Sequence, residues 1–316
     1  MTYQRNGELL LLCFLLGLAL AMLQPQVRLA QTSAGITATA TAEQMPSGIV
    51  KISSHDALDD LFAARAYDLA QIQSGQNMVP ALFLTSLPQD LHEMSEPQAR
   101  KNLFIRSVLP LALLVNQHIA EKRAEIERLA ALQQQNIAWN ERETAWIQDI
   151  AREYGLPQVD FEALRLRVDQ IPPSLLIAQA AEESGWGTSR FVRAGNALFG
   201  QQVYNPELGI RPDDREAGRK HYVRSFDNLF QTILSYTRNL NSHRAYDEFR
   251  TARAEMRRQE GKLDSLRLAG TLIDYSERRE AYVQTIQKII NANGLRHLDR
   301  AKLAVENATT WRARFI

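Results

Sequence analysis

Residues 171–202 read IPPSLLIAQAAEESGWGTSRFVRAGNALFGQQ, the most informative stretch of the chain. Pro172 and Pro173 suit the first turn of a helix, because the amide hydrogen that proline lacks has no partner there. Residues 174–181 are then apolar almost all the way round, and a helix of that kind is buried. Gly185 follows shortly and can end the helix. The sequence therefore predicts a buried helix that ends close to residue 185.

Two neighbouring acids, Glu182 and Glu183, lie at the end of this predicted helix, next to Trp186. A carboxyl group that emerges from an apolar helix beside an aromatic ring has a raised pKa, as a general acid at neutral pH requires. The alternative is that both carboxylates are solvated at the helix end. Helical spacing does not choose between the two glutamates, because each lies above apolar residues of the preceding turns.

The composition of the 316-residue chain excludes several classes of protein. Lysine and arginine (37) nearly balance aspartate and glutamate (36), which argues against a nucleic-acid binder. The single cysteine, Cys13, lies in an apolar N-terminal run, so the rest of the chain has no disulfide, thiolate nucleophile or cysteine-ligated metal. The histidines show no HExxH or comparable spacing, and no phosphate-binding glycine loop occurs. We therefore expect neither a metal nor a cofactor.

The N-terminal residues 9–23, LLLLCFLLGLALAML, are apolar and carry no charge. This run is shorter than the roughly 20 residues that span a bilayer, and it matches the apolar part of a secretory signal. Ala19-Leu20-Ala21 offers a cleavage site for the signal peptidase. The residues before the apolar run are only weakly basic, with Arg5, so the alternative is that the segment is retained as an inner-membrane anchor. We expect residues 1–30 to be a signal peptide or anchor, residues 31–48 a flexible tether, and the rest to be exported to the periplasm or cell envelope.

The apolar spacing predicts helices through most of the remaining chain. We expect an amphipathic helix over residues 55–69, a long helix from residue 100 interrupted at Pro110, a helix around 146–154, and one capped by Asp160 that runs to residue 168. The turn-rich residues 200–226 predict a small β-lobe with a strand at Tyr222–Val223. The predicted fold is mainly α (α+β), with a helical region over 49–145, a catalytic domain over 146–297 and a tail over 298–316.

Two motifs resemble the signatures of a known family. QAAEESGWG (179–187) and NALFG (196–200) are similar, in order and spacing, to those of the bacterial glucosaminidases, which include flagellar-rod and autolysin-type peptidoglycan hydrolases. The resemblance covers residues 151–295, and FLTSLPQDL (83–91) with RKNLFIRSVLPLAL (100–113) is similar to the Bax-like branch. It implies a lysozyme-like fold that cleaves the β-1,4 bond after N-acetylglucosamine in peptidoglycan glycan strands.

The resemblance also implies roles for individual residues. Glu183, which precedes Ser-Gly-Trp-Gly, corresponds to the family's general acid, which protonates the glycosidic oxygen. Tyr282 resembles the family's active-site tyrosine, although Tyr275 precedes it by seven residues where the family pattern has six. Glu216, in the β-lobe, is the candidate second carboxylate. Its competitors are Glu207, Asp213 and Asp214. A substrate-assisted route through the acetamido oxygen needs no second carboxylate and remains the alternative.

Several residues near the two motifs are candidates for sugar binding. They are Trp186, Asn196, Phe199, Tyr204, Tyr222 and Tyr275. Core packing is the alternative for each aromatic ring, and we prefer it for Phe199 and Tyr275. Two other functions stay open: a lytic transglycosylase, which shares the Glu-Ser start but usually continues with Gly-Leu-Met-Gln, and a non-catalytic glycan-binding or scaffold protein of the cell envelope. Residues 49–145 contain no motif that names a chemistry.

Overall fold

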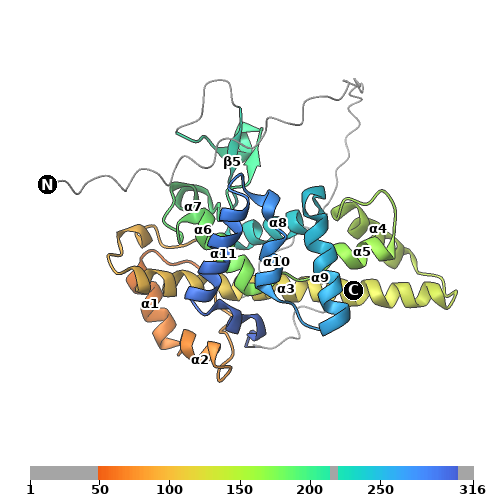
Figure 1. The fold of residues 1–316 in the computed structure, drawn as a ribbon, viewed down its shortest axis with the longest axis horizontal. Coiled ribbons are helices and arrows are strands. Elements are labelled where there is room, and N and C mark those ends of the chain that lie inside the picture. Colours follow the sequence, from red (N-terminus) through yellow and green to blue (C-terminus); the bar gives the residue numbers. More distant parts are fainter. Residues whose placement is uncertain (1–48, 214–219, 305–316) are drawn as a thin grey trace.

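A computed structural model of the protein describes residues 49–213 and 220–304 (Figure 1). Outside these residues lie the expected signal segment and tether, Asp214 and Glu216, and the last part of the expected tail. The helices are α1 (His55–Ala64), α2 (Leu69–Gln73), α3 (Pro97–Gln134), α4 (Glu141–Glu153), α5 (Phe161–Arg167), α6 (Pro173–Ser184), α7 (Arg190–Gly195), α8 (Leu229–Ser242), α9 (Asp247–Glu260), α10 (Ser265–Gly270) and α11 (Glu280–Ala292). The mainly α fold class is confirmed.

Short strands and 3₁₀ helices complete the described chain. β1 (Ile49–Val50) pairs in parallel with β2 (Phe83–Leu84). β3 (Gln202–Val203), β4 (Gly209–Ile210) and β5 (Tyr222–Arg224) form an antiparallel sheet in the order β3-β5-β4, which confirms the expected β-lobe. The 3₁₀ helices are η1 (Leu91–Glu93), η2 (Pro206–Leu208), η3 (Arg244–Tyr246), η4 (Ile273–Tyr275) and η5 (Leu295–Arg300).

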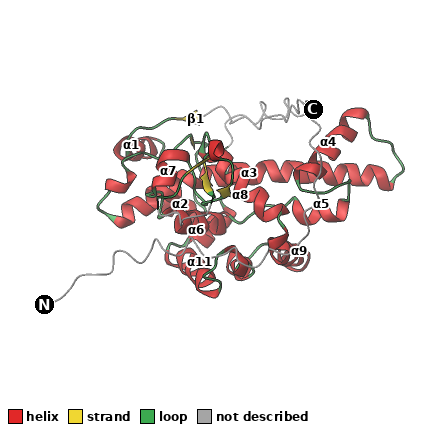
Figure 2. Cartoon of the chain, turned by 90° about the horizontal axis from the view of Figure 1, so that it is seen from above, coloured by secondary structure: helices red, strands yellow, loops and turns green. Residues whose placement is uncertain are grey.

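Helix α6 is the buried centre of the fold, as its sequence predicted. Residues 173–181 and Ser184 are all buried, and the helix contacts α3, α10, α11 and η5. Figure 2 shows it between α3 on one side and α11 on the other. Burial of each leucine or isoleucine side chain contributes about 1.5–3 kcal/mol to folding, so the packing of α6 is a large part of the stability. Gly185 ends the helix in the left-handed conformation, with φ 59°.

The N-terminal end of α6 receives a cap from a distant part of the chain. Asp299, in η5, accepts hydrogen bonds from the Ser174 backbone N–H (2.9 Å) and from the Ser174 hydroxyl (2.8 Å). A carboxylate at this end also interacts favourably with the helix dipole. Burial raises the pKa of the Asp299 carboxyl to about 6. The local sequence shows no cap for α6, because Pro172 at the cap position has no side-chain donor or acceptor.

The expected interruption at Pro110 is wrong, because α3 is one continuous 38-residue helix. A proline inside a helix costs about 3 kcal/mol. Here Pro110 and its neighbours, residues 103–105 and 107–112, are buried, and this packing offsets the cost. The helix is long and apolar enough to cross a membrane, but 78% of the apolar window is buried inside the protein, which is the property of a core helix. The hydrophobic core is continuous from Leu58 to Leu298.

The helix expected over residues 55–69 is divided in two by a turn. Ala66 has a positive φ of 47°, and the Tyr67 ring after it is buried edge-on against Phe62, with ring centroids 5.1 Å apart. Asp68 then caps α2 by accepting from the Ala70 N–H at 2.7 Å. The amphipathic pattern alone would favour one continuous helix over residues 55–69, but the burial of the Tyr67 ring outweighs this preference. The expected cap at Asp160 is confirmed, because its side chain accepts from the Ala163 N–H of α5.

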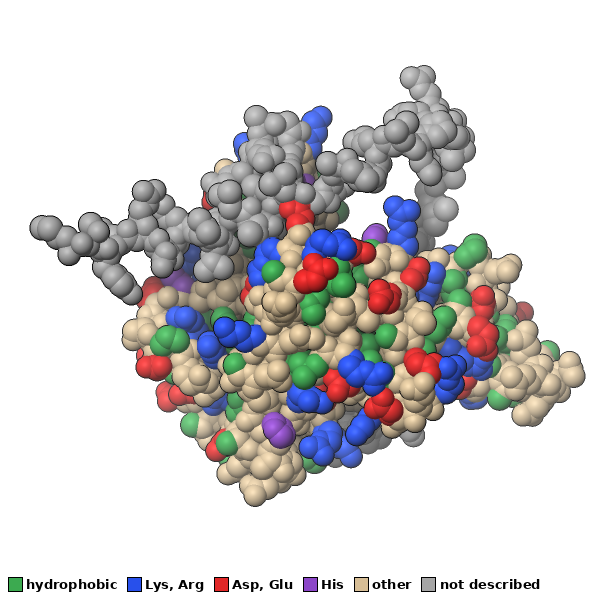
Figure 3. Space-filling model, viewed as in Figure 1, with side chains coloured by type: hydrophobic (Ala, Val, Ile, Leu, Met, Phe, Trp, Pro, Cys, Tyr) green, Lys and Arg blue, Asp and Glu red, His purple; other side chains and the backbone are tan. Residues whose placement is uncertain are grey.

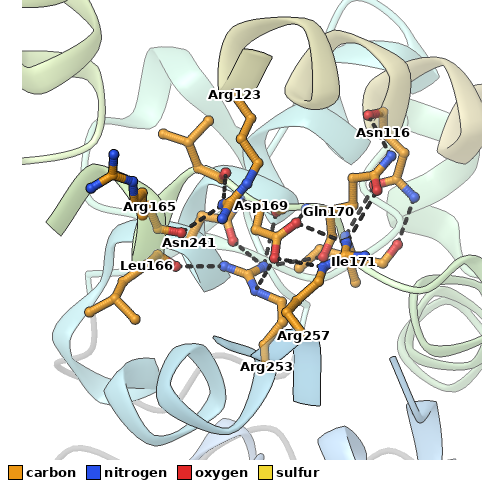
Figure 4. Close-up of polar contacts among 11 residues, drawn as sticks. Asn116, Arg123, Arg165, Leu166, Asp169, Gln170, Ile171, Asn241, Arg253 and Arg257 are labelled. Carbon is orange, nitrogen blue, oxygen red and sulfur yellow. Dashed lines mark hydrogen bonds and ion pairs between the residues drawn. The ribbon is translucent and has the colours of Figure 1, made fainter. Parts of the chain in front are cut away.

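Side chains from three helices hold the connector between α5 and α6 (Figure 4). Asn116 of α3 pairs with the Ile171 backbone through two hydrogen bonds, of 2.7 and 3.1 Å. Arg253 of α9 is completely buried and donates to the carbonyl oxygens of Leu166 (2.9 Å) and Asp169 (3.0 Å). Asn241 of α8 also donates to the Asp169 carbonyl, at 2.9 Å. These bonds fix the connector, and therefore the start of α6.

The Asp169 carboxylate compensates the buried positive charge of this connector. It accepts two hydrogen bonds from Arg257, the shorter of 2.9 Å, and lies 3.7 Å from the Arg253 guanidinium. Burial alone would raise the pKa of the Asp169 carboxyl, but Arg253 and Arg257 outweigh it, and the pKa lies below its ordinary value. Burial lowers the pKa of Arg253 to about 10, so this side chain is still charged at neutral pH.

Replacement of Arg253 by methionine tests this clamp. Arg253→Met removes the donor to the partly buried Leu166 carbonyl oxygen, one of the two donors to the buried Asp169 carbonyl oxygen and one charged partner of the Asp169 carboxylate. We therefore expect the free energy of unfolding to fall by about 3 kcal/mol. Chemical denaturation at neutral pH measures it. The matched control is Arg258→Met on the same helix, whose side chain is 76% exposed and pairs with Glu255. We expect a change below about 0.5 kcal/mol there, and equal losses in both variants would contradict the assignment.

Candidate active site

The two candidate glutamates at the end of α6 lie in different surroundings. Glu182 accepts a hydrogen bond from the Arg278 guanidinium at 2.6 Å, and Arg278 also donates to the Thr285 hydroxyl of α11 at 2.7 Å. Among the described residues no cation is bonded to Glu183, whose carboxyl accepts a hydrogen bond from the Tyr282 hydroxyl. The neighbouring acids are therefore distinct, one in an ion pair and the other against a tyrosine.

The Glu183 carboxyl is only partly exposed, and burial raises its pKa to about 7. The hydrogen bond from Tyr282 lowers this pKa, the negative charge of Glu182 raises it, and the positive charge of Arg278 lowers it. A carboxyl group with a pKa near 7 is protonated in a large fraction of molecules at neutral pH. Glu183 can therefore donate a proton under conditions in which an ordinary glutamate is ionised.

Four tyrosines from separate elements gather around Glu183. Tyr236 lies on α8, Tyr246 in η3, Tyr275 in η4 and Tyr282 on α11. The rings of Tyr275 and Tyr282 stack at 5.3 Å and 11°, and Tyr246 lies 5.9 Å from Tyr275. Burial, with the negative charge of Glu183, raises the pKa of all four, that of Tyr246 to about 12. These hydroxyls therefore stay protonated and can donate hydrogen bonds.

Gln179 connects two of these tyrosines from inside α6. Its side chain is completely buried one turn before Glu183. Its Nε2 donates to the Tyr282 hydroxyl oxygen at 2.9 Å, and its Oε1 accepts from the Tyr236 hydroxyl at 2.6 Å. Gln179, Tyr236 and Tyr246 were not predicted from the sequence. A signal for Gln179 was present, because it is a rare polar side chain in a helix that is apolar almost all round.

The turn after α6 holds Trp186 in an unusual conformation. Gly185, Trp186 and Gly187 all have positive φ, of 59°, 58° and 81°. At Gly187 a Cβ atom would lie 2.5 Å from a methyl carbon of Leu87, so only glycine fits there. The Trp186 ring is partly exposed, meets Phe104 of α3 edge-on at 5.8 Å and lies under the Lys101 ammonium group. A positive φ in a bulky residue is strained, and such strain gathers at functional sites.

The other predicted sugar-binding residues are placed differently. Asn196 caps α7 with φ 52° and donates to the Phe226 carbonyl at 3.0 Å, so its amide serves the backbone. Phe199 is 4% exposed and stacks on Tyr236 at 3.9 Å; its ring belongs to the core and is not available to a sugar. Tyr275 is partly buried in the tyrosine cluster. The side chains of Tyr204, 67% exposed, and Tyr222, partly exposed, lie on the sheet that stands out beside α7 in Figure 1.

The described residues contain two of the four candidates for the second carboxylate. Glu207 is exposed in η2, and Asp213, 77% exposed, pairs with Arg190 at 3.1 Å. Glu216 and Asp214 lie outside the described residues. Within residues 49–213 and 220–304, no three His, Cys, Asp or Glu side chains lie close enough together to hold a metal ion. Figure 3 shows acidic and basic side chains interspersed over one face of the molecule.

Comparison with known proteins places the chain in a family. Residues 162–295 match the glucosaminidase family model, described as mannosyl-glycoprotein endo-beta-N-acetylglucosaminidase. The chain is also 32% identical to protein Bax of Escherichia coli (strain K12) over 204 residues, 63% of this chain and 71% of that protein. The chain belongs to the glucosaminidase family. This glucosaminidase is a glycoside hydrolase of the Bax-like branch, and its substrate is a glycan. No solved structure matches it.

The matched region of this glucosaminidase contains every residue described around Glu183. It begins within α5, includes α6, the sheet and α8, and ends at the start of η5. Helix α3 lies before this region, yet it packs against α6 and α8 and supplies Phe104 behind Trp186. The site therefore depends on packing from outside the family region.

Glu183 imposes a pH dependence on the stability of this glucosaminidase. Its folded-state pKa of about 7 exceeds the ordinary value of 4.5, so folding favours the protonated form. Full stability is present below pH 4.5 and is lost as the pH rises through 7. Glu183→Gln removes this loss. We expect the variant to match the wild type at pH 4.5 and to exceed it by about 2 kcal/mol in free energy of unfolding at pH 8, by chemical denaturation. A constant difference at both pH values would contradict the raised pKa.

Proposed function

We propose that this glucosaminidase hydrolyses the β-1,4 bond after N-acetylglucosamine in peptidoglycan glycan strands, with Glu183 as general acid. The observation that carries the proposal is the partly buried Glu183 carboxyl, with its pKa raised to about 7 and a tyrosine hydroxyl bonded to it. Glu182 is less suited to this role, because its carboxylate is already engaged in an ion pair with Arg278 at 2.6 Å. The apolar residues 9–23, expected to direct export, support a cell-envelope substrate.

In the proposed reaction Glu183 protonates the glycosidic oxygen as the bond to the anomeric carbon breaks. Positive charge then develops on the sugar ring, as in an oxocarbenium ion. The acid is left as a carboxylate, and the Tyr282 hydroxyl and the Arg278 charge both stabilise that form. Since the pKa of Glu183 is close to 7, the same group can both release the proton and recover it at neutral pH.

The second half of the reaction has two candidate routes. In one, Glu216, which lies between β4 and β5 in the sequence and outside the described residues, activates water or attacks the anomeric carbon. In the other, the acetamido oxygen of the substrate attacks that carbon, and no second carboxylate takes part. We assign sugar contacts to the partly exposed Trp186, three residues after Glu183, to Tyr204 next to β3 and to Tyr222 in β5.

Digestion of purified cell-wall sacculi tests this function. We expect the wild-type protein to release fragments with reducing N-acetylglucosamine ends, detected by mass spectrometry, at a rate that falls as the pH rises above about 7, where Glu183 ionises. Glu183→Gln should lower this rate at least about 100-fold. Glu182→Gln is the matched control and should stay within about tenfold of the wild type, because its carboxylate acts only through the charge it places near Glu183.

Other products would contradict the proposal in distinct ways. New anhydro-muramic ends would identify a lytic transglycosylase. Retained binding to sacculi without new ends would identify a non-catalytic glycan-binding protein. Unchanged fragments and rate in Glu183→Gln, with a loss in Glu182→Gln, would transfer the acid role to Glu182.

A further inference from the structure

The hydrogen bonds of Gln179 have a definite direction. The amide can lie in two orientations that exchange its oxygen and nitrogen, but the two distances differ in a way that selects one. The 2.6 Å contact with Tyr236 is typical of O–H to O, and the 2.9 Å contact with Tyr282 of N–H to O. Tyr236 therefore donates to the amide oxygen, and the amide nitrogen donates to Tyr282.

This direction leaves the Tyr282 hydroxyl with one use for its own proton. The oxygen already accepts from Gln179, and among the described residues the remaining partner of the hydroxyl is the Glu183 carboxyl, whose pKa it lowers. The donors thus form a chain in one direction, from Tyr236 through Gln179 and Tyr282 to Glu183. With the amide reversed, Gln179 would accept from Tyr282, and the proton would turn away from Glu183.

We propose that Tyr236 and Gln179 are positioning residues that hold the Tyr282 hydroxyl as a permanent donor to Glu183. The proposal rests on the proposed role of Glu183 as general acid. A carboxyl oxygen that accepts from Tyr282 is the one without a proton. The chain therefore keeps the acidic proton on the other oxygen, from which it can be transferred to the substrate.

Burial makes this chain rigid. Gln179 is completely buried and Tyr236 is 1% exposed, so water does not compete for their hydrogen bonds. Tyr236 is further held by its stack on Phe199, with the rings 3.9 Å apart and 9° from parallel. This gives Phe199, for which core packing was the preferred interpretation, an indirect part in the site. It supports the ring whose hydroxyl orients the amide.

Other charged or titratable groups also face Glu183 and have to be separated from the effect of the chain. Glu182 lies beside it on α6, Arg278 precedes α11, and Tyr246 and Tyr275 approach from η3 and η4. The Tyr246 hydroxyl bonds to Asn239 and is not a member of the chain. A test must therefore change Tyr236 or Gln179 and leave these groups in place.

Tyr236→Phe is the decisive variant, because it removes the donor at the start of the chain and keeps the ring. Gln179 is then free to turn and accept from Tyr282, and Glu183 loses its donor. We expect the pKa of Glu183 to rise by about one unit, and the alkaline limb of the pH profile of kcat on sacculi to shift to higher pH by the same amount. We also expect kcat to fall about tenfold while KM stays within about twofold of the wild-type value. The control is Tyr67→Phe, whose buried hydroxyl has no hydrogen-bond partner within residues 49–213 and 220–304; neither the alkaline limb nor kcat should change.

A second variant tests whether the effect passes through the amide. Gln179→Met has a similar volume and no hydrogen-bonding group. In this background Tyr236→Phe should add nothing to the pKa shift, because the connection is already broken.

The carboxyl signal of Glu183, followed by NMR in protein with labelled glutamate, measures each pKa without any substrate. The titration thus tests the chain even if the protein does not cleave glycan, a failure that would count against the proposed function alone. An unchanged titration in Tyr236→Phe, or additive shifts in the double variant, would overturn the proposal.

Discussion

Burial of α6 on every side is the constraint around which the fold and the site are built. An apolar helix enclosed by α3, α10, α11 and η5 has no solvent at its buried first turn to satisfy the free backbone N–H groups there. That end therefore needs protein partners. Asp299 provides the cap at the first turn, and the clamp of Asn116, Arg253 and Asp169 fixes the connector that enters it. At the other end the left-handed turn at residues 185–187 brings Trp186 against α3.

The same burial produces the chemistry that we propose. Glu183 has a raised pKa because the helix that carries it is enclosed, and this cost in stability is what makes the group a proton donor at neutral pH. Glu182, one residue earlier, differs because it reaches Arg278. A difference of one position around a helix therefore separates an ion pair from a candidate acid, and the buried Gln179 one turn earlier connects that acid to α8 and α11.

The elements with strong local signals were predicted from the sequence. The start of α6 at two prolines, its end at Gly185, the Asp160 cap and the strand at Tyr222 all follow from backbone preferences within a few residues. The predictions that failed needed long-range packing. Pro110 is tolerated because the surrounding helix is buried, and the helix over residues 55–69 is divided because Tyr67 packs inward. In both cases tertiary packing outweighs the local preference.

The candidate site shows the same division. The motif ending in Gly-Trp-Gly was enough to name two glutamates, and together with Asn196–Gly200 it resembled a family, which implied a type of bond and pointed to Glu183. The physical character of the helix does not choose between Glu182 and Glu183, since both follow the same apolar turns. Their different environments come from Arg278 and Tyr282, roughly a hundred residues later in the chain. Only the tertiary structure brings these groups to the end of α6, because hydrogen bonding and burial depend on distance in space.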